Sequence, residues 1–181
     1  MTILELAILQ IGPIPRRILL LGCAGAGKTT LAARLGEAIG APVICLDAIW
    51  RPGRSEADIP GFRAQMAEMH AGPAWVSDGN FAQATFDLRL PRAQLVIWLD
   101  TPRPVCLWRA LIRPFRQGEP HRPADLGKVL HFIWNFDRVN RPRIERLRLE
   151  HGPGVPVLRL RSRADVMRFV AQSKAGLGVE A

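Results

Sequence analysis

The 181-residue chain lacks several features that would have pointed to other classes of protein. No apolar run approaches the roughly eighteen residues of a membrane-spanning helix, so the sequence predicts no membrane partner. The apolar segment 1–15 has no basic leader and no small-residue cleavage site, which argues against a signal peptide. Internal repeats and low-complexity stretches are also absent. The length therefore favours one globular domain with a real core.

Cysteine and lysine are both scarce. The cysteines are odd in number and have no metal-ligand spacing, namely Cys23, Cys45 and Cys106. This pattern predicts a reduced, cytoplasmic protein without a disulfide framework. Lysine occurs only at positions 28, 128 and 174, and arginine supplies the rest of the basic charge.

The net charge of +9 has two interpretations. Arginine suits a bidentate grip on phosphates, but a coding bias toward arginine also explains the imbalance. Direct nucleic-acid binding stays open on charge alone. It is not favoured, because there is no lysine-rich tail and no recognisable nucleic-acid module.

One motif dominates the sequence. Eight residues fit the phosphate-binding pattern G-x-x-x-x-G-K-[ST] and are followed by a further threonine; the predicted nucleotide-binding residues are Gly22, Cys23, Ala24, Gly25, Ala26, Gly27, Lys28, Thr29 and Thr30. The glycines let the backbone turn tightly and approach an anion, and the N–H groups of the turn form a cradle for phosphate oxygens. Lys28 is predicted to reach the β- and γ-phosphates, and the Thr29 hydroxyl to bind Mg²⁺. The alternative is a glycine-rich turn that binds nothing.

The flanks of the motif favour the phosphate-binding interpretation. The apolar run 17–21 before it is typical of a buried parallel strand. Leu31, Leu35 and Ile39 after it recur at four-residue spacing, as on one face of a helix, and Gly40 and Pro42 close that helix. Strand, loop and helix thus follow in the order that the motif requires.

Short apolar segments recur between helical ones along the whole chain. The predicted strands are residues 18–21, 43–46, 74–77, 95–99 and 155–160. Helices between them imply crossover connections and a parallel sheet, and so a three-layer α/β/α fold. A long helical stretch over 125–150 should kink or split at Pro142.

Aspartates follow three of the predicted strands, at the rim where ligands bind in open parallel sheets. They are Asp47, Asp78 and Asp100. A carboxylate there can hold Mg²⁺ or accept a proton from an attacking hydroxyl, and Asp78 is the predicted Mg²⁺ ligand. An aspartate at such a position can equally cap the next helix. We favour function for Asp47 and Asp78, as catalytic residues, and capping for Asp100.

The arginine- and proline-rich segment around 113–123 has loop composition and suits a lid. Arginines that close from a lid can stabilise the charge that develops in phosphoryl transfer; the candidates are Arg109, Arg113, Arg116 and Arg122. The alternative interpretation of each of these arginines, taken singly, is a solvated surface residue. Arg138, in the long helical stretch, is a candidate for substrate phosphate or for plain exposure to water.

Four of the five tryptophans are predicted to lie in the core. Trp75 and Trp98 fall within strands, and Trp108 and Trp134 recur at helical spacing among apolar residues. Trp50 differs, because it follows Asp47 in a loop and could stack on a substrate ring.

Several short motifs together resemble the small nucleoside-monophosphate-kinase-like P-loop proteins, and more narrowly the bacterial topology modulation protein (FlaR-like) family. The similarity covers about residues 16–172; it rests on the phosphate-binding loop and on segments 46–50, 78–81, 86–90, 99–103, 107–109, 140–144 and 158–163. It implies a five-stranded parallel sheet in the order 2-3-1-4-5 with a small lid, and ATP and Mg²⁺ as cofactors. The implied organisation is an N-terminal extension (1–15), a single P-loop kinase-like domain (16–175) with a substrate-side insert (about 47–72) and a lid (about 109–124), and a tail (176–181).

The resemblance also suggests roles for individual residues. Asp78 takes the place of the aspartate in the Asp-Gly motif of adenylate kinases, and Asp47 the place where shikimate- and gluconate-kinase-like proteins touch metal or substrate. After Asp-Gly, adenylate kinases have Phe-Pro-Arg, whereas this chain has Asn80, Phe81 and an alanine. The arginine that would grip AMP is therefore missing there. Asn80 and, from the next helix, Arg89 are the candidate substrate contacts.

These observations predict a phosphotransferase that moves the γ-phosphate of Mg-ATP to an unidentified small molecule or nucleotide. The alternative is an ATP-binding regulatory protein with slow ATPase activity, whose family name suggests an effect on DNA topology. The sequence leaves monomer and homodimer open. GTPases are disfavoured, because no Asn-Lys-x-Asp base-recognition motif occurs.

Overall fold

The computed structural model describes residues 15–50, 55–117 and 123–175, with the side chains of 113–117, 123–125 and 174–175 outside that description. The expected N-terminal extension, except Pro15, and the expected tail lie outside the described residues, as does Arg122. Within the part of the chain that is described, no helix is both long and apolar enough to cross a bilayer.

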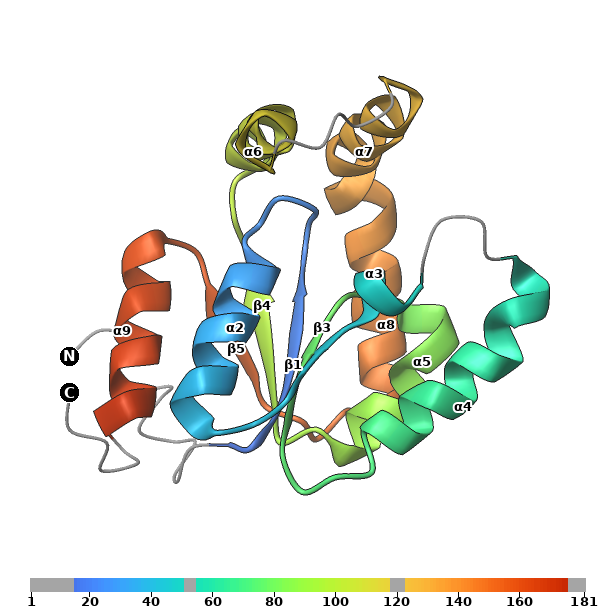
Figure 1. Ribbon diagram of the computed structural model, residues 1–181, viewed down its shortest axis with the longest axis vertical. Helices are drawn as coiled ribbons and strands as arrows, with labels where there is room; N and C mark the ends of the chain where they lie inside the picture. The colour runs from blue at the N-terminus through green and yellow to red at the C-terminus, as the bar shows by residue number, and fades with distance from the viewer. Residues whose placement is uncertain (1–14, 51–54, 118–122, 176–181) are drawn as a thin grey trace.

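A five-stranded parallel sheet forms the centre of the molecule (Figure 1). Its strands are β1 (Arg17–Gly22), β2 (Val43–Cys45), β3 (Trp75–Asp78), β4 (Leu95–Leu99) and β5 (Val157–Leu160). Their order is β2-β3-β1-β4-β5, which confirms the predicted α/β fold class and topology. β1 lies in the middle, and its residues 18–21 are completely buried, which explains why the strands read as continuous apolar runs.

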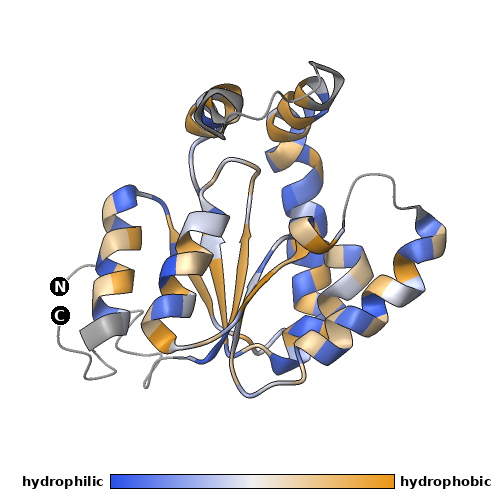
Figure 2. Ribbon diagram, viewed as in Figure 1, coloured by the Kyte–Doolittle hydropathy of each residue, from blue (hydrophilic) through white to orange (hydrophobic). Residues whose placement is uncertain are grey.

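Helices cover both faces of this sheet. α2 (Lys28–Ile39) packs beside α9 (Arg163–Ala175), whereas α5 (Ala82–Arg89) packs between α4 (Ile59–Met69) and α8 (Arg141–His151) (Figure 1). Figure 2 shows the resulting polarity, with apolar strands at the centre and mixed polar and apolar helices around them. Three short helical elements complete this part of the chain: α3 (Leu46–Ile49), η1 (Glu56–Asp58) and η2 (Leu90–Arg92). Leu46 therefore begins a helical turn and does not extend β2.

Two further helices, α6 (Arg103–Gln117) and α7 (Pro123–Asn135), pack on each other beyond the end of the sheet (Figure 1). We call this pair the lid helices. A π-helical turn, η3 (Phe136–Asn140), connects α7 to α8. Pro142 stands in the first turn of α8, where its missing N–H costs nothing, so the long helical stretch divides near this proline as its sequence indicated.

The tryptophan predictions were half right. Trp75 and Trp98 are fully buried, as expected for strand residues. Trp108 and Trp134 were expected in the core, but each is 63% exposed. They lie on the lid helices, which stand beyond the sheet, so their helical spacing marks a face that the sheet does not cover (Figure 1).

Candidate functional site

The phosphate-binding loop leaves β1 at Gly22 and enters α2 at Lys28. Gly22, Gly25 and Gly27 all have φ values in the left-handed half of conformational space, at 146°, 75° and 100°. A Cβ at Gly22 would lie 2.7 Å from the Leu99 carbonyl oxygen, and one at Gly25 would lie 2.6 Å from that of Cys106. Backbone from β4 and α6 therefore closes on the loop from outside, and only glycine fits.

The carbonyl oxygens of the loop accept hydrogen bonds from side chains. The Lys28 ammonium donates to the carbonyls of Gly22 and Cys23, at 3.1 and 3.0 Å. The Arg109 guanidinium donates to those of Gly25 and Ala26, at 3.3 and 3.2 Å, and the Thr101 hydroxyl also donates to Ala26 at 3.1 Å. A loop whose carbonyls are engaged in this way can turn N–H groups toward an anion.

The first turn of α2 adds to this preference for negative charge. Gly27 is its N-cap, no side chain among the described residues caps it, and the first turn contains no acidic residue. The leading N–H groups of a helix have no partner inside the helix, and they form the positive end of its dipole. Phosphate oxygens can accept hydrogen bonds from these N–H groups, and they carry the negative charge that the dipole favours. The loop and the helix start therefore fit a nucleotide phosphate chain.

Asp78 and Thr29 meet beside this loop. The Thr29 hydroxyl donates to Asp78 Oδ2 at 2.7 Å, and the Cys45 thiol lies 3.9 Å from the same oxygen. Asp78 is only 1% exposed, and its Oδ1 is buried without a hydrogen-bond partner. An unpaired buried carboxylate oxygen next to a threonine hydroxyl fits Mg²⁺, which prefers oxygen ligands and keeps the rest of its shell from phosphates and water.

The described residues contain no cluster of three histidine, cysteine or acidic side chains that could hold a metal by itself. The Thr29–Asp78 pair supplies two oxygen-bearing side chains, which are too few to hold a cation without further ligands. The Cys45 thiol next to it stays protonated, because burial raises its pKa.

The second predicted aspartate lies at the neighbouring strand end. Asp47 is exposed in α3, directly after β2, and β2 pairs with β3 up to the Cys45–Asp78 position. Trp50 ends α3, and its ring contacts Phe62 edge-on at 5.0 Å and approaches Phe81 at 6.3 Å. Trp50 and Phe81 are partly exposed and pack with Phe62 against the hydrophobic core, so an aromatic cluster lies at the end of α3.

Arg89 does not lie where substrate contact was expected. It is completely buried, and its guanidinium donates to Ser77 Oγ at 3.1 Å and to the carbonyls of Gly79 and Asn80 at 3.0 and 2.5 Å. Burial lowers its pKa to about 9, against the opposing effect of Asp78. Arg89 therefore holds the loop between β3 and α5 in shape and has no exposed surface in this structure.

Asn80 is also engaged within the protein. Its side-chain amide accepts from the Gly22 N–H at 3.2 Å and donates to the Gly22 carbonyl at 3.0 Å. It was expected to contact the substrate, but both ends of its amide are bound to the first residue of the phosphate-binding loop.

The arginines predicted for the lid fall into two groups. Arg109 reaches the phosphate-binding loop from α6, whereas Arg113 and Arg116 lie on that helix where side chains are outside the description. Arg138 is exposed in η3.

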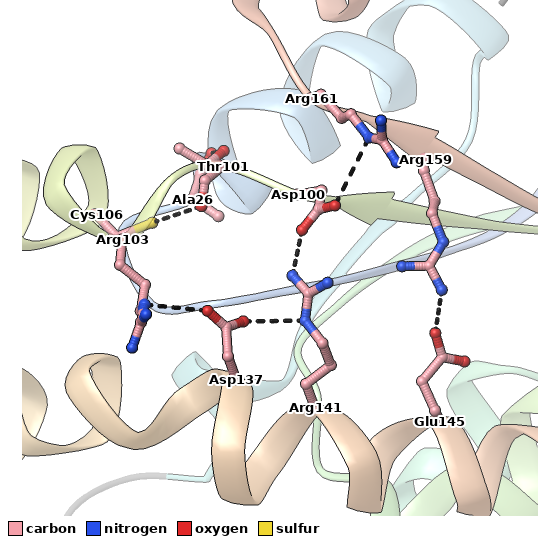
Figure 3. Close-up of polar contacts among 10 residues, drawn as sticks. All are labelled: Ala26, Asp100, Thr101, Arg103, Cys106, Asp137, Arg141, Glu145, Arg159 and Arg161. Atoms are coloured by element: carbon pink, nitrogen blue, oxygen red, sulfur yellow. Dashed lines mark hydrogen bonds and ion pairs between the residues drawn. The ribbon is translucent and has the colours of Figure 1, made fainter. Parts of the chain in front are cut away.

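Asp100 does not cap α6, which begins three residues later, but joins an ion-pair network (Figure 3). It pairs with Arg141 of α8 and lies 3.8 Å from Arg161. Asp137 of η3 binds Arg141 at 3.0 Å and Arg103 of α6 at 3.1 Å. This network connects the end of β4 to η3, α8 and the base of α6. The sequence carried one weak signal for it, the four-residue spacing of Asp137 and Arg141.

Comparison with known proteins supports the fold but gives no sequence-level family. No family model matches this chain, and no curated protein sequence matches it. Among solved structures, it is similar to a gluconokinase from Sinorhizobium meliloti, with 20% identity, a TM-score of 0.53, and 92% and 93% of the two chains covered. It is also similar to a shikimate kinase from Bacteroides thetaiotaomicron, with 20% identity, a TM-score of 0.55, and 92% and 100% covered.

A shikimate kinase from Acinetobacter baumannii is similar at 20% identity and a TM-score of 0.52, with 90% of this chain and 94% of that one covered. These likenesses show a P-loop kinase-like fold that spans most of the chain. The narrower resemblance to the topology modulation family rests on the sequence motifs alone.

Proposed function

We propose that the protein is a phosphotransferase that binds Mg-ATP at the phosphate-binding loop and transfers its γ-phosphate to a small molecule or nucleotide. The observation that carries this proposal is the contact between Thr29 and Asp78, with the unpaired Asp78 Oδ1, beside an uncapped helix start. Phosphoryl transfer requires a cation site next to a phosphate site, and this contact supports such an arrangement.

The residues have separate roles in this proposal. The loop from Gly22 to Thr30 holds the phosphates, and Lys28 turns from the loop carbonyls to the β- and γ-phosphates. Thr29 and Asp78 would hold Mg²⁺, which supplies neutralisation of the phosphate charge when bound. Arg109, already at the loop, would stabilise the transferring group, with Arg113 and Arg116 as further candidates on α6.

The acceptor is assigned to the side of β2 and β3. Asp47 would accept the proton of the attacking hydroxyl, and Trp50 would form a wall of the acceptor pocket together with Phe81. Arg138 is the remaining candidate for an anionic group of the acceptor. Fold relatives named for gluconate and shikimate support a small hydroxylated acceptor, and the missing adenylate kinase arginine argues against AMP.

The test is phosphate transfer against a panel of nucleosides, nucleoside monophosphates, sugars and small hydroxy acids. Wild type should consume ATP faster with at least one acceptor, and Lys28→Ala should lose this stimulation, whereas Lys128→Ala on α7 should keep it. If no acceptor raises ATP consumption and Lys28→Ala equals wild type throughout, the proposal fails. Tight, Lys28-dependent ATP binding with slow acceptor-independent hydrolysis would support the regulatory alternative that the family resemblance suggests.

A further inference from the structure

Asn80 occupies an unusual position relative to the phosphate-binding loop. β1 and β3 pair in parallel up to Leu20 and Asp78. Continuing this register by two residues on each strand brings Asn80 opposite Gly22. The backbone does not continue as a strand, because Gly79 has a φ of 133° and Phe81 a φ of 33°. The Asn80 side chain bridges the gap instead.

The two hydrogen bonds of this side chain copy a backbone pairing. A peptide group in a sheet offers one N–H and one C=O to its neighbour, and the asparagine amide offers the same two groups. Here the amide oxygen accepts from Gly22 N at 3.2 Å, and the amide nitrogen donates to Gly22 O at 3.0 Å. Among side chains of this length, only an amide does both, since a carboxylate has no N–H to donate.

Asn80 is itself held from the far side. Arg89 donates to the carbonyls of Gly79 and Asn80, and also to Ser77 Oγ. Ser77 Oγ in turn contacts His70 Nε2 at 2.9 Å, and His70 Nδ1 lies 2.7 Å from the Met66 carbonyl. A buried chain of polar contacts therefore runs from the end of α4 to the loop that carries Asn80.

The backbone around Asn80 also shows that this loop is held in one shape. Phe81 is the one non-glycine residue with a positive φ among the described residues. Such a conformation costs about 1–3 kcal/mol and persists only where its surroundings fix it. The bonds of Arg89 to both carbonyls before Phe81 provide that restraint.

Gly22 is where the held loop meets the donor site. Its carbonyl accepts from Asn80 and also from the Lys28 ammonium at 3.1 Å. Asn80 and the Lys28 ammonium thus donate to the same carbonyl oxygen, that of Gly22, at the first turn of the phosphate-binding loop.

We infer that Asn80 is a positioning residue of the nucleotide site, which fixes the entry of the phosphate-binding loop through Gly22, and not a contact for the acceptor. This inference deepens the proposed function and rests on nucleotide binding at that loop. A loop that spends less time in the binding shape binds nucleotide more weakly in proportion.

The test compares Asn80→Leu with wild type and with a matched control, Gln94→Leu. Gln94 Oε1 accepts from the backbone N–H groups of Arg16 and Arg17, so this control loosens the opposite end of the same strand. Two quantities are measured without any acceptor: the affinity for ADP, and the rate of amide hydrogen exchange in a peptide covering residues 20–29.

In Asn80→Leu, ADP affinity should fall about tenfold or more, because a partly buried pair of hydrogen bonds is lost, and exchange in residues 20–29 should accelerate. Gln94→Leu should leave both near wild type. Asn80→Asp keeps the size of the side chain but cannot donate to the Gly22 carbonyl, so both measurements should change as in Asn80→Leu. It replaces Asn80→Leu in the test if that variant does not fold.

The inference is overturned if exchange in residues 20–29 is unchanged in both Asn80 variants, or if Gln94→Leu weakens ADP binding equally. A wild-type protein that binds no nucleotide would instead sink the proposed function. The exchange comparison would then still decide the role of Asn80, because it needs no ligand.

Discussion

Thr29 and Asp78 are joined by a 2.7 Å hydrogen bond from the threonine hydroxyl to the carboxylate Oδ2. The bond connects the start of α2, which follows the phosphate-binding loop, to the end of β3, the strand that pairs with β1. It leaves the second carboxylate oxygen buried and unpaired. A bound cation would give this oxygen the partner that the described residues do not supply.

Replacing that carboxylate should separate metal binding from nucleotide binding. Asp78→Asn keeps an oxygen for Thr29 but removes the charge, so Mg²⁺ should no longer strengthen ADP binding, while metal-free ADP affinity changes by less than about threefold. ATP turnover should fall on the order of a hundredfold. The measurement is ADP affinity with and without Mg²⁺.

Asp87→Asn is the matched control, since Asp87 is an aspartate on α5 that binds Arg63 at the surface at 2.6 Å. It should retain the Mg²⁺ effect. Equal loss of the effect in both variants would show that Asp78 has no special part in holding the cation.

Two glycines with positive φ make a second comparison. Gly25→Ala puts a methyl group 2.6 Å from the Cys106 carbonyl at a φ of 75°, whereas Gly40→Ala, at a φ of 59°, meets nothing within 4 Å. Both should pay the conformational cost of about 1–2 kcal/mol, and Gly25→Ala should add about 1–3 kcal/mol of overpacking. Urea unfolding measures this difference.

Nucleotide affinity should follow the location of each glycine. Gly25→Ala displaces the phosphate-binding loop or α6 and should weaken ADP binding at least a hundredfold, whereas Gly40→Ala, at the far end of α2, should bind as wild type does. Similar stability and affinity in the two variants would contradict the close packing of the loop on α6.

The third prediction concerns stability in acid. His70 is completely buried between Met66 and Ser77, and burial lowers its pKa to about 4 from 6.5. The unfolded chain therefore binds more protons between pH 6.5 and 4. The contribution of His70 to stability is complete above pH 6.5, falls as the pH drops through this window, and amounts to about 3 kcal/mol in total.

Acidic groups also titrate near pH 4, so the prediction is a difference between variants. His70→Gln should show a shallower loss of unfolding free energy from pH 7 to 4 than wild type, and His131→Gln, which changes an exposed histidine of α7, should match wild type. Parallel pH profiles for all three proteins would rule out a buried neutral His70.

The fold followed from the sequence because the central strands β1, β3 and β4 are buried on both faces and read as apolar runs. The phosphate-binding loop followed because glycines at fixed spacing have one dominant use. Arg89 could not be placed in the same way. A buried arginine whose main partners are backbone carbonyls leaves no pattern along the chain, and its helix looks like any polar surface helix.

Asp100 and the lid tryptophans show two other limits. The partner of Asp100 lies 41 residues further on, so only the folded chain reveals that it forms an ion pair and does not cap a helix. For Trp108 and Trp134 the helical spacing was real, but spacing does not say whether a further layer covers that face.

The exposure of those two tryptophans gives the protein a built-in optical reporter. The chain contains no tyrosine, so its near-ultraviolet emission comes almost entirely from five tryptophans. Trp75 and Trp98 are sealed in the sheet, whereas Trp108 and Trp134 meet water on the lid helices. Iodide, which quenches only indoles it can touch, therefore divides the signal into a constant interior part and a quenchable part from Trp108 on α6, Trp134 on α7 and the partly exposed Trp50.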